Sequence, residues 1–288
     1  MFVYTRCMSV IKKYLYLALI SFFLFGCAST DIHDTGEQEE HQETTADDDA
    51  SSLSETEDES GVWITLRRAP LKEEGGRYAY LTFDDGPSQN TRRILEILSD
   101  FQVKGTFFFV GDRIAELGNT HAADILRRVL ADGHFIGMHS MTHDMQHLYR
   151  VPGAHRNFYN EMRTLQSLIK RLTGGFETNL YRPPYGSRGM FTADHIRTMR
   201  ESDLRSWDWN IDSLDWKLTT VDGVMNSIKN EMKNKDDPHN AVILLHERTV
   251  TVRALPSIIE YYRDLGYTFL PYHPGNHFVM SRINNPDL

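Results

Sequence analysis

The chain has 288 residues, of which 40% are hydrophobic and 25% are charged, and these ordinary globular proportions exclude a collagen-like, a mostly disordered or a many-spanning membrane protein. The formal net charge of −9 argues against a nucleic-acid-binding protein, which needs a basic surface. Most of this acidity lies in residues 28–60, which hold 13 Asp and Glu and no Lys or Arg, whereas residues 61–288 hold 28 basic and 27 acidic side chains.

The N-terminus has the features of an export signal. Three basic residues precede the apolar run 14–25. At a rise of about 1.5 Å per residue, this run is too short to cross the ~30 Å hydrocarbon core of a membrane as a helix, which favours a signal peptide. Cys27 follows Leu24-Phe25-Gly26 and resembles the cysteine of a bacterial lipoprotein box, which predicts that residues 1–26 are removed and Cys27 is lipidated. An uncleaved membrane anchor is the alternative, and both place the rest of the chain outside the cytoplasm.

Residues 27–60 are predicted to be the lipidated cysteine and the acidic, disordered tether that follows it. This segment is rich in Asp, Glu, Ser and Thr and has few large apolar side chains, so it cannot bury enough surface to offset its conformational entropy. Like charges extend such a segment. The chain has two cysteines, Cys7 and Cys27, so the domain predicted at 61–288 has no thiol for a disulfide, a nucleophile or a metal.

From residue 61 the apolar pattern alternates between strand and helix, with a motif-bearing core at about 78–270. An edge strand is expected at 62–66, and further strands at 78–83, 106–110, 135–138, 205–209, 241–245 and 267–270. Helices, marked by apolar residues at the i, i+3, i+4, i+7 spacing, are expected around 94–101, 122–129, 158–172, 221–232 and 255–262. This alternation predicts an α/β fold with a parallel sheet, and about seven βα units favour a distorted (β/α) barrel over an open doubly wound sheet.

Polar side chains recur where the predicted strands end. They are Asp84 and Asp85, His139 and His143, Asp212 and Asp215, and His246. A single such residue more often caps a loop than binds a ligand. Because functional groups of a (β/α) barrel gather at the C-terminal ends of its strands, their recurrence there indicates one common site.

Three of these residues form a candidate metal site. His139 and His143 are four residues apart, close enough on a helical turn to share one ion. Asp85 would complete a site of two histidines and a carboxylate, which is typical of a catalytic zinc or a similar divalent ion with open positions. Asp84 beside it is left to act as a base on the water at the metal.

Five ordered motifs then resemble those of the NodB-type polysaccharide deacetylases, carbohydrate esterase family 4. They are TFDDGP at 82–87, HSMTH at 139–143, RPPYG at 182–186, DSLDW at 212–216 and LLH at 244–246. Together they span most of the predicted domain. The resemblance implies a distorted (β/α) barrel that removes acetyl groups from acetylated sugars in polymers.

The resemblance also assigns a role to each motif residue. It implies that Asp85, His139 and His143 bind the divalent metal and that Asp84 is the general base. The backbone N–H of Tyr185 would hold the oxyanion. The remaining implied roles are His246 as general acid, Asp215 as its partner, Arg182 as the residue that orients Asp84, and Leu244 and Trp216 as walls of the pocket for the acetyl methyl.

Histidines and tryptophans outside these roles are not assigned a part in catalysis. His134 is interpreted as a structural residue, and Trp207 and Trp209 as core residues or as sugar-stacking residues at the rim. Seven further histidines carry no partner pattern and are expected at the surface: His121, His147, His155, His195, His239, His273 and His277.

The sequence therefore predicts an exported, membrane-tethered, metal-dependent polysaccharide N-deacetylase. Peptidoglycan N-acetylglucosamine is the expected substrate because of the predicted location, with chitin-like glycans, exopolysaccharides or O-acetylated xylan as alternatives. One divalent ion is expected, Zn²⁺ ahead of Co²⁺ or Mn²⁺, and neither a nucleic acid nor a protein partner is. The rival hypotheses are an amidohydrolase of small cyclic amides and a non-catalytic glycan-binding lipoprotein.

Overall fold

The computed structural model describes residues 69–236 and 238–283. The predicted signal peptide 1–26, the lipidation site Cys27, the tether up to residue 60 and the edge strand at 62–66 all lie outside the described residues. These four predictions therefore stay predictions. The described part contains all five motifs.

Strands and helices alternate along the described chain, as the apolar pattern predicts. The strands are β1 (Tyr78–Gly86), β2 (Gly105–Phe109), β3 (Phe135–Met138), β4 (Leu180–Tyr181), β5 (Arg205–Ser206), β6 (Ile211–Asp212), β7 (Asn240–His246) and β8 (Thr268–Phe269). The helices are α1 (Thr91–Asp100), α2 (Gly111–Leu117), α3 (Asn119–Ala131), α4 (Ala154–Thr173), α5 (Ala193–Arg200), α6 (Val221–Asn234) and α7 (Thr249–Asp264). A π-helical turn η1 (Gln146–Arg150) precedes α4, and a 3₁₀ turn η2 (Pro274–Asn276) follows β8.

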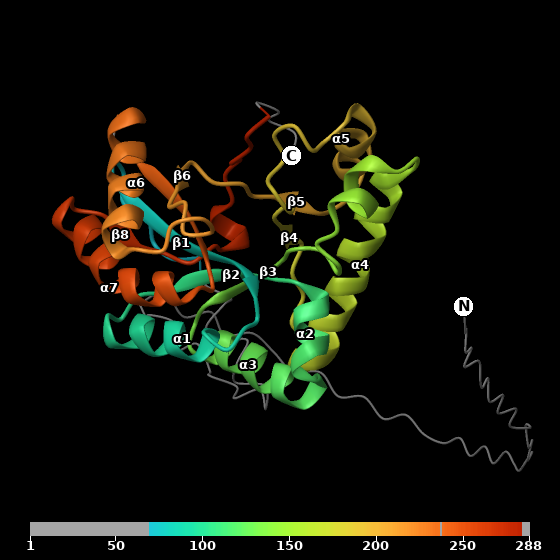
Figure 1. Ribbon diagram of the computed structural model, residues 1–288, viewed down its shortest axis with the longest axis horizontal. Coiled ribbons are helices and arrows are strands. Elements are labelled where there is room, and N and C mark those ends of the chain that lie inside the picture. The colour runs from blue at the N-terminus through green and yellow to red at the C-terminus, as the bar shows by residue number, and fades with distance from the viewer. Residues whose placement is uncertain (1–68, 237, 284–288) are drawn as a thin grey trace, which may run out of the picture. The chain divides into compact units, whose positions relative to one another are not determined.

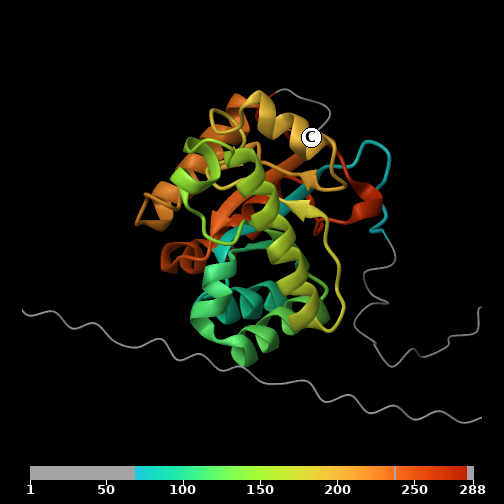
Figure 2. The ribbon, with the colours of Figure 1, turned by 90° about the vertical axis from the view of Figure 1, so that its right-hand side faces the viewer.

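The strands form one curled parallel sheet with the helices around it (Figures 1 and 2). Its order is β5-β4-β3-β2-β1-β7-β6, and β8 pairs with the start of β1. Within the described residues no strand ladder joins β5 to β6, so the barrel is not closed. The predicted distorted (β/α) barrel is confirmed, and β1 lies at its centre between β2 and β7.

The central strands are buried on both faces. The side chains of β2 are all buried, and so are those of β1 except the half-buried Asp85. Such continuous burial is expected for parallel strands that helices cover. Trp207 is fully buried and Trp209 is 8% exposed, so both belong to the core. His134 is buried too, and its Nδ1 accepts a hydrogen bond from the Gly105 N–H (3.0 Å), which makes it structural as predicted.

The prediction that His195 lies at the surface is wrong. This side chain is 2% exposed and stacks on the ring of Phe191, with ring centroids 5.4 Å apart. Its Nδ1 lies 2.8 Å from the Thr192 hydroxyl at the start of α5, and its Nε2 lies 2.9 Å from the Leu148 carbonyl oxygen. The buried imidazole thus closes the N-terminus of α5 and joins it to η1. The contact with Leu148 bridges segments 47 residues apart, so no local pattern in the sequence reveals it.

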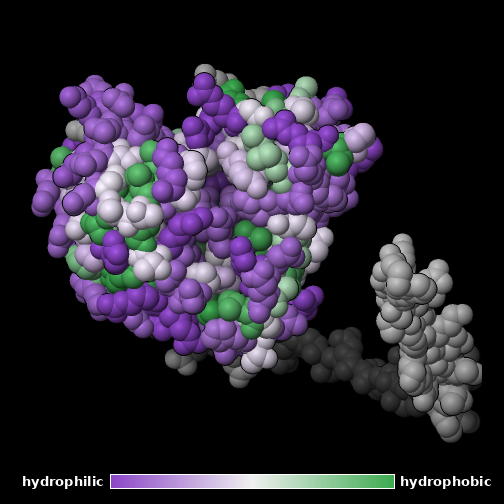
Figure 3. Space-filling view, viewed as in Figure 1, coloured by the Kyte–Doolittle hydropathy of each residue, from purple (hydrophilic) through white to green (hydrophobic). Residues whose placement is uncertain are grey.

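The surface in the view of Figure 3 is mostly hydrophilic, with small, separate apolar areas. In the described ranges, the length and hydrophobicity that a bilayer-crossing helix needs do not occur together in any helix.

Candidate active site

A β-bulge at the end of β1 brings two successive carboxylates to one place. Asp84 pairs with Phe108 of β2 and Gly86 with Phe109, so Asp85 has no partner in the ladder. Asp85 also has a left-handed backbone, with φ of 66°. In a regular strand, neighbouring side chains point to opposite faces, but the bulge re-aims the extra residue. As a result, Asp84 Oδ2 and Asp85 Oδ1 lie 3.7 and 3.6 Å from the same atom, His139 Nε2.

Asp85, His139 and His143 converge as a metal site requires. One ligand atom from each lies within 4.8 Å of the others, and Asp85 Oδ1 is 3.3 Å from His143 Nε2. Asp85 Oδ1 is buried without a hydrogen-bond partner, so a cation would satisfy it. His139 Nδ1 lies 2.8 Å from the carbonyl oxygen of Arg182, to which it donates, and this leaves the Nε2 lone pair for a metal. The residues present therefore fit a divalent ion.

The two histidines are carried by a loop, which corrects the expectation of a helical turn. Residues 139–144 lie in neither a helix nor a strand. Ser140 and His143 have left-handed φ values of 65° and 56°, and the Ser140 hydroxyl accepts a hydrogen bond from the His143 N–H (2.9 Å). This tight loop, rather than helical periodicity, brings the two imidazoles together, with ring centroids 5.1 Å apart.

Glu161 of α4 stabilises this loop by accepting hydrogen bonds from it. Its Oε2 accepts hydrogen bonds from the backbone N–H groups of Met141 (2.9 Å) and Thr142 (3.0 Å), and its Oε1 accepts one from the Thr142 hydroxyl (2.9 Å). The motifs did not identify Glu161. Its one sign in the sequence is its place in the apolar stripe of α4, three residues after Phe158, where a carboxylate must be paired to be buried.

The charges of the site favour metal binding. Burial by itself would raise the pKa of Asp85, but the neighbouring His139, His143, His246 and Arg248 outweigh it and the pKa is lowered. Burial, followed by the neighbouring His139, lowers the pKa of His143 to about 4. At neutral pH the site therefore offers a carboxylate and a neutral imidazole, which are the forms that bind a cation.

Arg182 is hydrogen-bonded to Asp84. The guanidinium is fully buried, and its Nη1 donates to Asp84 Oδ1 (2.9 Å) and to the Thr82 hydroxyl (2.7 Å). Its Nε and Nη2 donate to the carbonyl oxygens of Trp207 (2.8 Å) and Asp208 (2.9 Å). Because these acceptors bind three of its nitrogens, the guanidinium of Arg182 is held in one orientation. Asp84 Oδ1 is thereby fixed, and Oδ2 is left facing the metal site.

His246 and Asp215 form the predicted pair beside Asp84. His246 is the register partner of Asp84 on β7, and its Nδ1 lies 2.7 Å from Asp215 Oδ1. Asp215 Oδ2 accepts hydrogen bonds from the His246 N–H (2.7 Å) and the Thr251 hydroxyl (2.5 Å). Burial would lower the pKa of His246, but the hydrogen bond and charge of Asp215, with Asp84 and Asp85, raise it to about 9. The imidazolium can thus serve as an acid at neutral pH.

Known proteins share the sequence features of this chain. A family model described as polysaccharide deacetylase matches residues 72–207. A peptidoglycan-N-acetylglucosamine deacetylase of Bacillus cereus is 36% identical over 221 residues, which are 75% of this chain and 77% of that protein. The chain belongs to the polysaccharide deacetylase family.

Further relatives agree with this membership. A Bacillus subtilis protein named as a polysaccharide deacetylase is 36% identical over 198 residues, 68% of this chain and 67% of that protein. The crystal structure of a polysaccharide deacetylase from Bacillus cereus matches with a TM-score of 0.65 and 35% identity, and covers 74% of this chain and all of that one. The resemblance seen in the five motifs is confirmed for the domain.

Tyr185 of this deacetylase contacts the loop that carries His143. It has a left-handed φ of 65°, is 45% exposed, and its hydroxyl donates to the carbonyl oxygen of His143 (3.1 Å). In residues 69–236 and 238–283 its backbone N–H has no hydrogen-bond acceptor. A free N–H beside the metal loop is suited to bind a developing negative charge.

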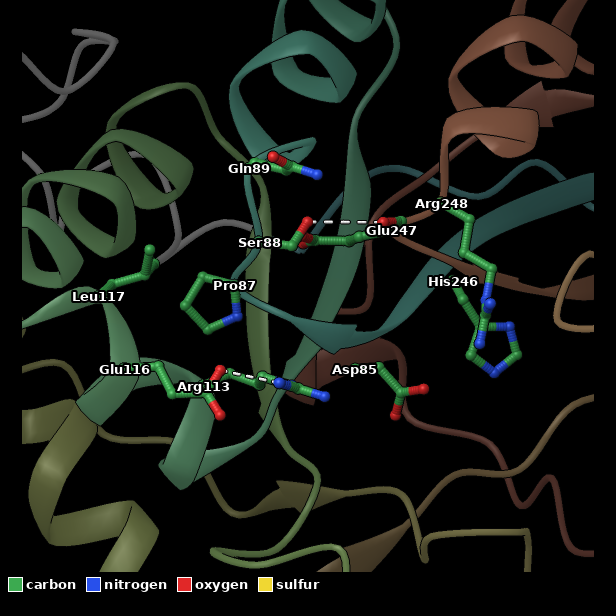
Figure 4. A pocket seen from close by; sticks show the side chains of 10 residues that line it. All are labelled: Asp85, Pro87, Ser88, Gln89, Arg113, Glu116, Leu117, His246, Glu247 and Arg248. Carbon is green, nitrogen blue, oxygen red and sulfur yellow. Dashed lines mark hydrogen bonds and ion pairs between the residues drawn. The ribbon is translucent and has the colours of Figure 1, made fainter.

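The other motif residues differ in their positions. Leu244 is buried in β7 (3% exposed) and Trp216 is 48% exposed, and neither lines the pocket of Figure 4. Their role as walls for the acetyl methyl stays a prediction. Asp212 is not part of the triad, and its Oδ1 accepts a hydrogen bond from the Leu214 N–H (2.9 Å) within a turn.

Proposed function

We propose that this polysaccharide deacetylase is a metal-dependent hydrolase that removes acetyl groups from the N-acetylglucosamine of peptidoglycan, with Zn²⁺ as its ion. One observation carries the proposal: a triad that fits a divalent cation lies beside an oriented carboxylate, Asp84, and a histidine of raised pKa, His246. The relative from Bacillus cereus that is named for peptidoglycan supports the choice of substrate.

The reaction divides between two side chains and one backbone group. When bound, the ion would acidify the attacking water and polarise the acetyl carbonyl. Asp84 Oδ2 takes the proton from that water while Oδ1 stays bonded to Arg182. The N–H of Tyr185 donates to the oxyanion, an interaction typically worth ~3 kcal/mol.

His246 completes the reaction by protonating the departing nitrogen. Collapse of the tetrahedral intermediate breaks the C–N bond, and an unprotonated amine anion is a very poor leaving group. Nδ1 is held by Asp215, so the proton leaves from Nε2. Both halves of this acid–base pair have their partners in place, which is evidence against the rival hypothesis of a non-catalytic glycan-binding protein.

Acetate release tests the proposed function directly. The purified chain, loaded with Zn²⁺, is expected to release acetate from N-acetylated glycan oligomers, to stop after chelation and to recover when Zn²⁺ is restored. The assay compares peptidoglycan fragments, chitin oligomers and acetylated xylan. Faster acetate release from chitin oligomers or from acetylated xylan would contradict peptidoglycan as the substrate. Acetate release that chelation leaves unchanged would contradict the metal dependence.

We propose further that the enzyme acts outside the cytoplasmic membrane, anchored through lipidated Cys27. The basic residues, the apolar run and the cysteine at residues 6–27 support this location. The variant Cys27→Ala, produced in a bacterial host, is expected to move from the membrane fraction to the soluble exported fraction. Retention of this variant in the membrane would favour an uncleaved anchor instead.

A further inference from the structure

A second feature of the site is an open pocket of about 440 Å³ that adjoins the metal triad (Figure 4). It shares Asp85 and His246 with the reaction centre and extends past Pro87 to Leu117 of α2. Ligand sites usually have volumes of roughly 300–1,000 Å³, so this pocket has room for a sugar unit next to the one that reacts. The groups that line it therefore bear on which glycan the enzyme prefers.

Two guanidinium groups line the pocket, and they differ in how they are paired (Figure 4). Arg113 of α2 donates from Nη1 to Glu116 Oε2 (2.7 Å), so its charge is already compensated. Arg248 immediately precedes α7 and is exposed. Among the described residues, no carboxylate oxygen lies within 4.0 Å of the Arg248 guanidinium, the distance limit of an ion pair.

The carboxylates nearest to Arg248, in the sequence and in the pocket, have other interactions. Glu247, its neighbour, is 6% exposed, and its Oε2 accepts a hydrogen bond from the Thr91 hydroxyl inside the protein (2.5 Å). The absence of a side chain on Gly86 leaves the space that this carboxyl occupies. Asp85 belongs to the metal triad. Arg248 thus has no ion-pair partner among the described residues, although its charge also acts on Asp85, and it lies at the edge of a pocket that leads to the reacting atoms.

We propose that Arg248 binds a carboxylate on the sugar next to the one that is deacetylated, so that the enzyme prefers acidic glycans to neutral ones. This inference rests on the proposed function. A guanidinium has a fork of N–H donors that matches a carboxylate, and such a charge-assisted pair is stronger than a neutral hydrogen bond. A glycan with carboxylate-bearing sugars between its N-acetylated sugars supplies this partner, whereas a chitin-like polymer does not.

The test compares two substrates that differ at one group, which is charged in one and neutral in the other. One is an N-acetylated oligosaccharide in which alternate sugars carry a free carboxylate, and the other is the same oligosaccharide with its carboxylates converted to methyl esters. The variant Arg248→Gln is expected to lower kcat/KM for the acidic substrate about fivefold. For the methyl ester, kcat/KM should stay within about twofold of the wild-type value. Arg248→Lys should restore part of the loss, because it keeps the charge without the fork.

A matched control is Arg253→Gln, since Arg253 lies in α7 and is exposed like Arg248, but does not line the pocket. Arg253→Gln removes the same charge and should leave kcat/KM unchanged for both substrates. If Arg248→Gln lowers kcat/KM equally for both substrates, Arg248 acts on the reaction centre. If it lowers kcat/KM for neither, Arg248 does not contact the glycan. Both results overturn the inference while wild-type acetate release still supports the proposed function. A wild type that releases no acetate from either substrate overturns both.

Discussion

The variant Asp84→Asn is expected to lower kcat for acetate release by about 10³-fold, because a general base contributes roughly 10²- to 10⁴-fold and an amide cannot take the proton. Asn has nearly the same shape, and its oxygen can still accept from Arg182. Since the metal triad does not include Asp84, metal affinity should change far less than kcat. Activity is measured with saturating Zn²⁺, and affinity by competition with a chelator.

The control for this experiment is Asp124→Asn, the same chemical change at an exposed aspartate of α3 that is not part of the triad. Its kcat should stay within about threefold of the wild type. Asp84→Asn also removes the counter-ion of the buried Arg182, a change that typically costs about 3–5 kcal/mol of stability, so the folded fraction is checked by thermal unfolding. A folded, metal-loaded Asp84→Asn protein with wild-type kcat would show that another group is the base.

The variant Asp215→Asn is expected to shift the alkaline limb of the pH–rate profile down by about two units or more. In the wild type, Asp215 raises the pKa of His246 to about 9, so the acid stays protonated through neutral pH. Without that carboxylate, burial lowers the pKa to the ordinary value of about 6.5 or below. At pH 8 the protonated fraction, and with it kcat, should fall by about 30-fold, whereas at pH 6 the loss should be small.

This pH dependence separates a change in the acid from general damage to the site. A structural defect would lower kcat by a similar factor at pH 6 and pH 8. Thr251→Val is a milder comparison, because it removes one hydrogen bond to Asp215 Oδ2 and keeps the contact between Asp215 and His246. We expect a smaller shift of the alkaline limb in this variant. An alkaline limb of Asp215→Asn that coincides with the wild type would contradict the role of Asp215.

Much of the fold follows from patterns that the sequence displays openly. The apolar runs at 78–83, 106–110, 135–138 and 241–245 correspond to β1, β2, β3 and β7, because a strand buried on both faces must be apolar throughout. The two-residue strands β4 and β6, and helices α2 and α5, were not predicted. Segments this short show too little periodicity to be distinguished from loops.

The sequence by itself determined which residues meet, and the tertiary structure decided how they face one another. In a parallel sheet the C-terminal ends of β1, β3 and β7 must share one edge, so the grouping of Asp84, His139 and His246 there follows from chain order. The bulge at Asp85, the left-handed loop of His143 and the support from Glu161 do not follow in the same way. They depend on pairing register and on contacts between distant segments, which local patterns of hydrophobicity do not encode.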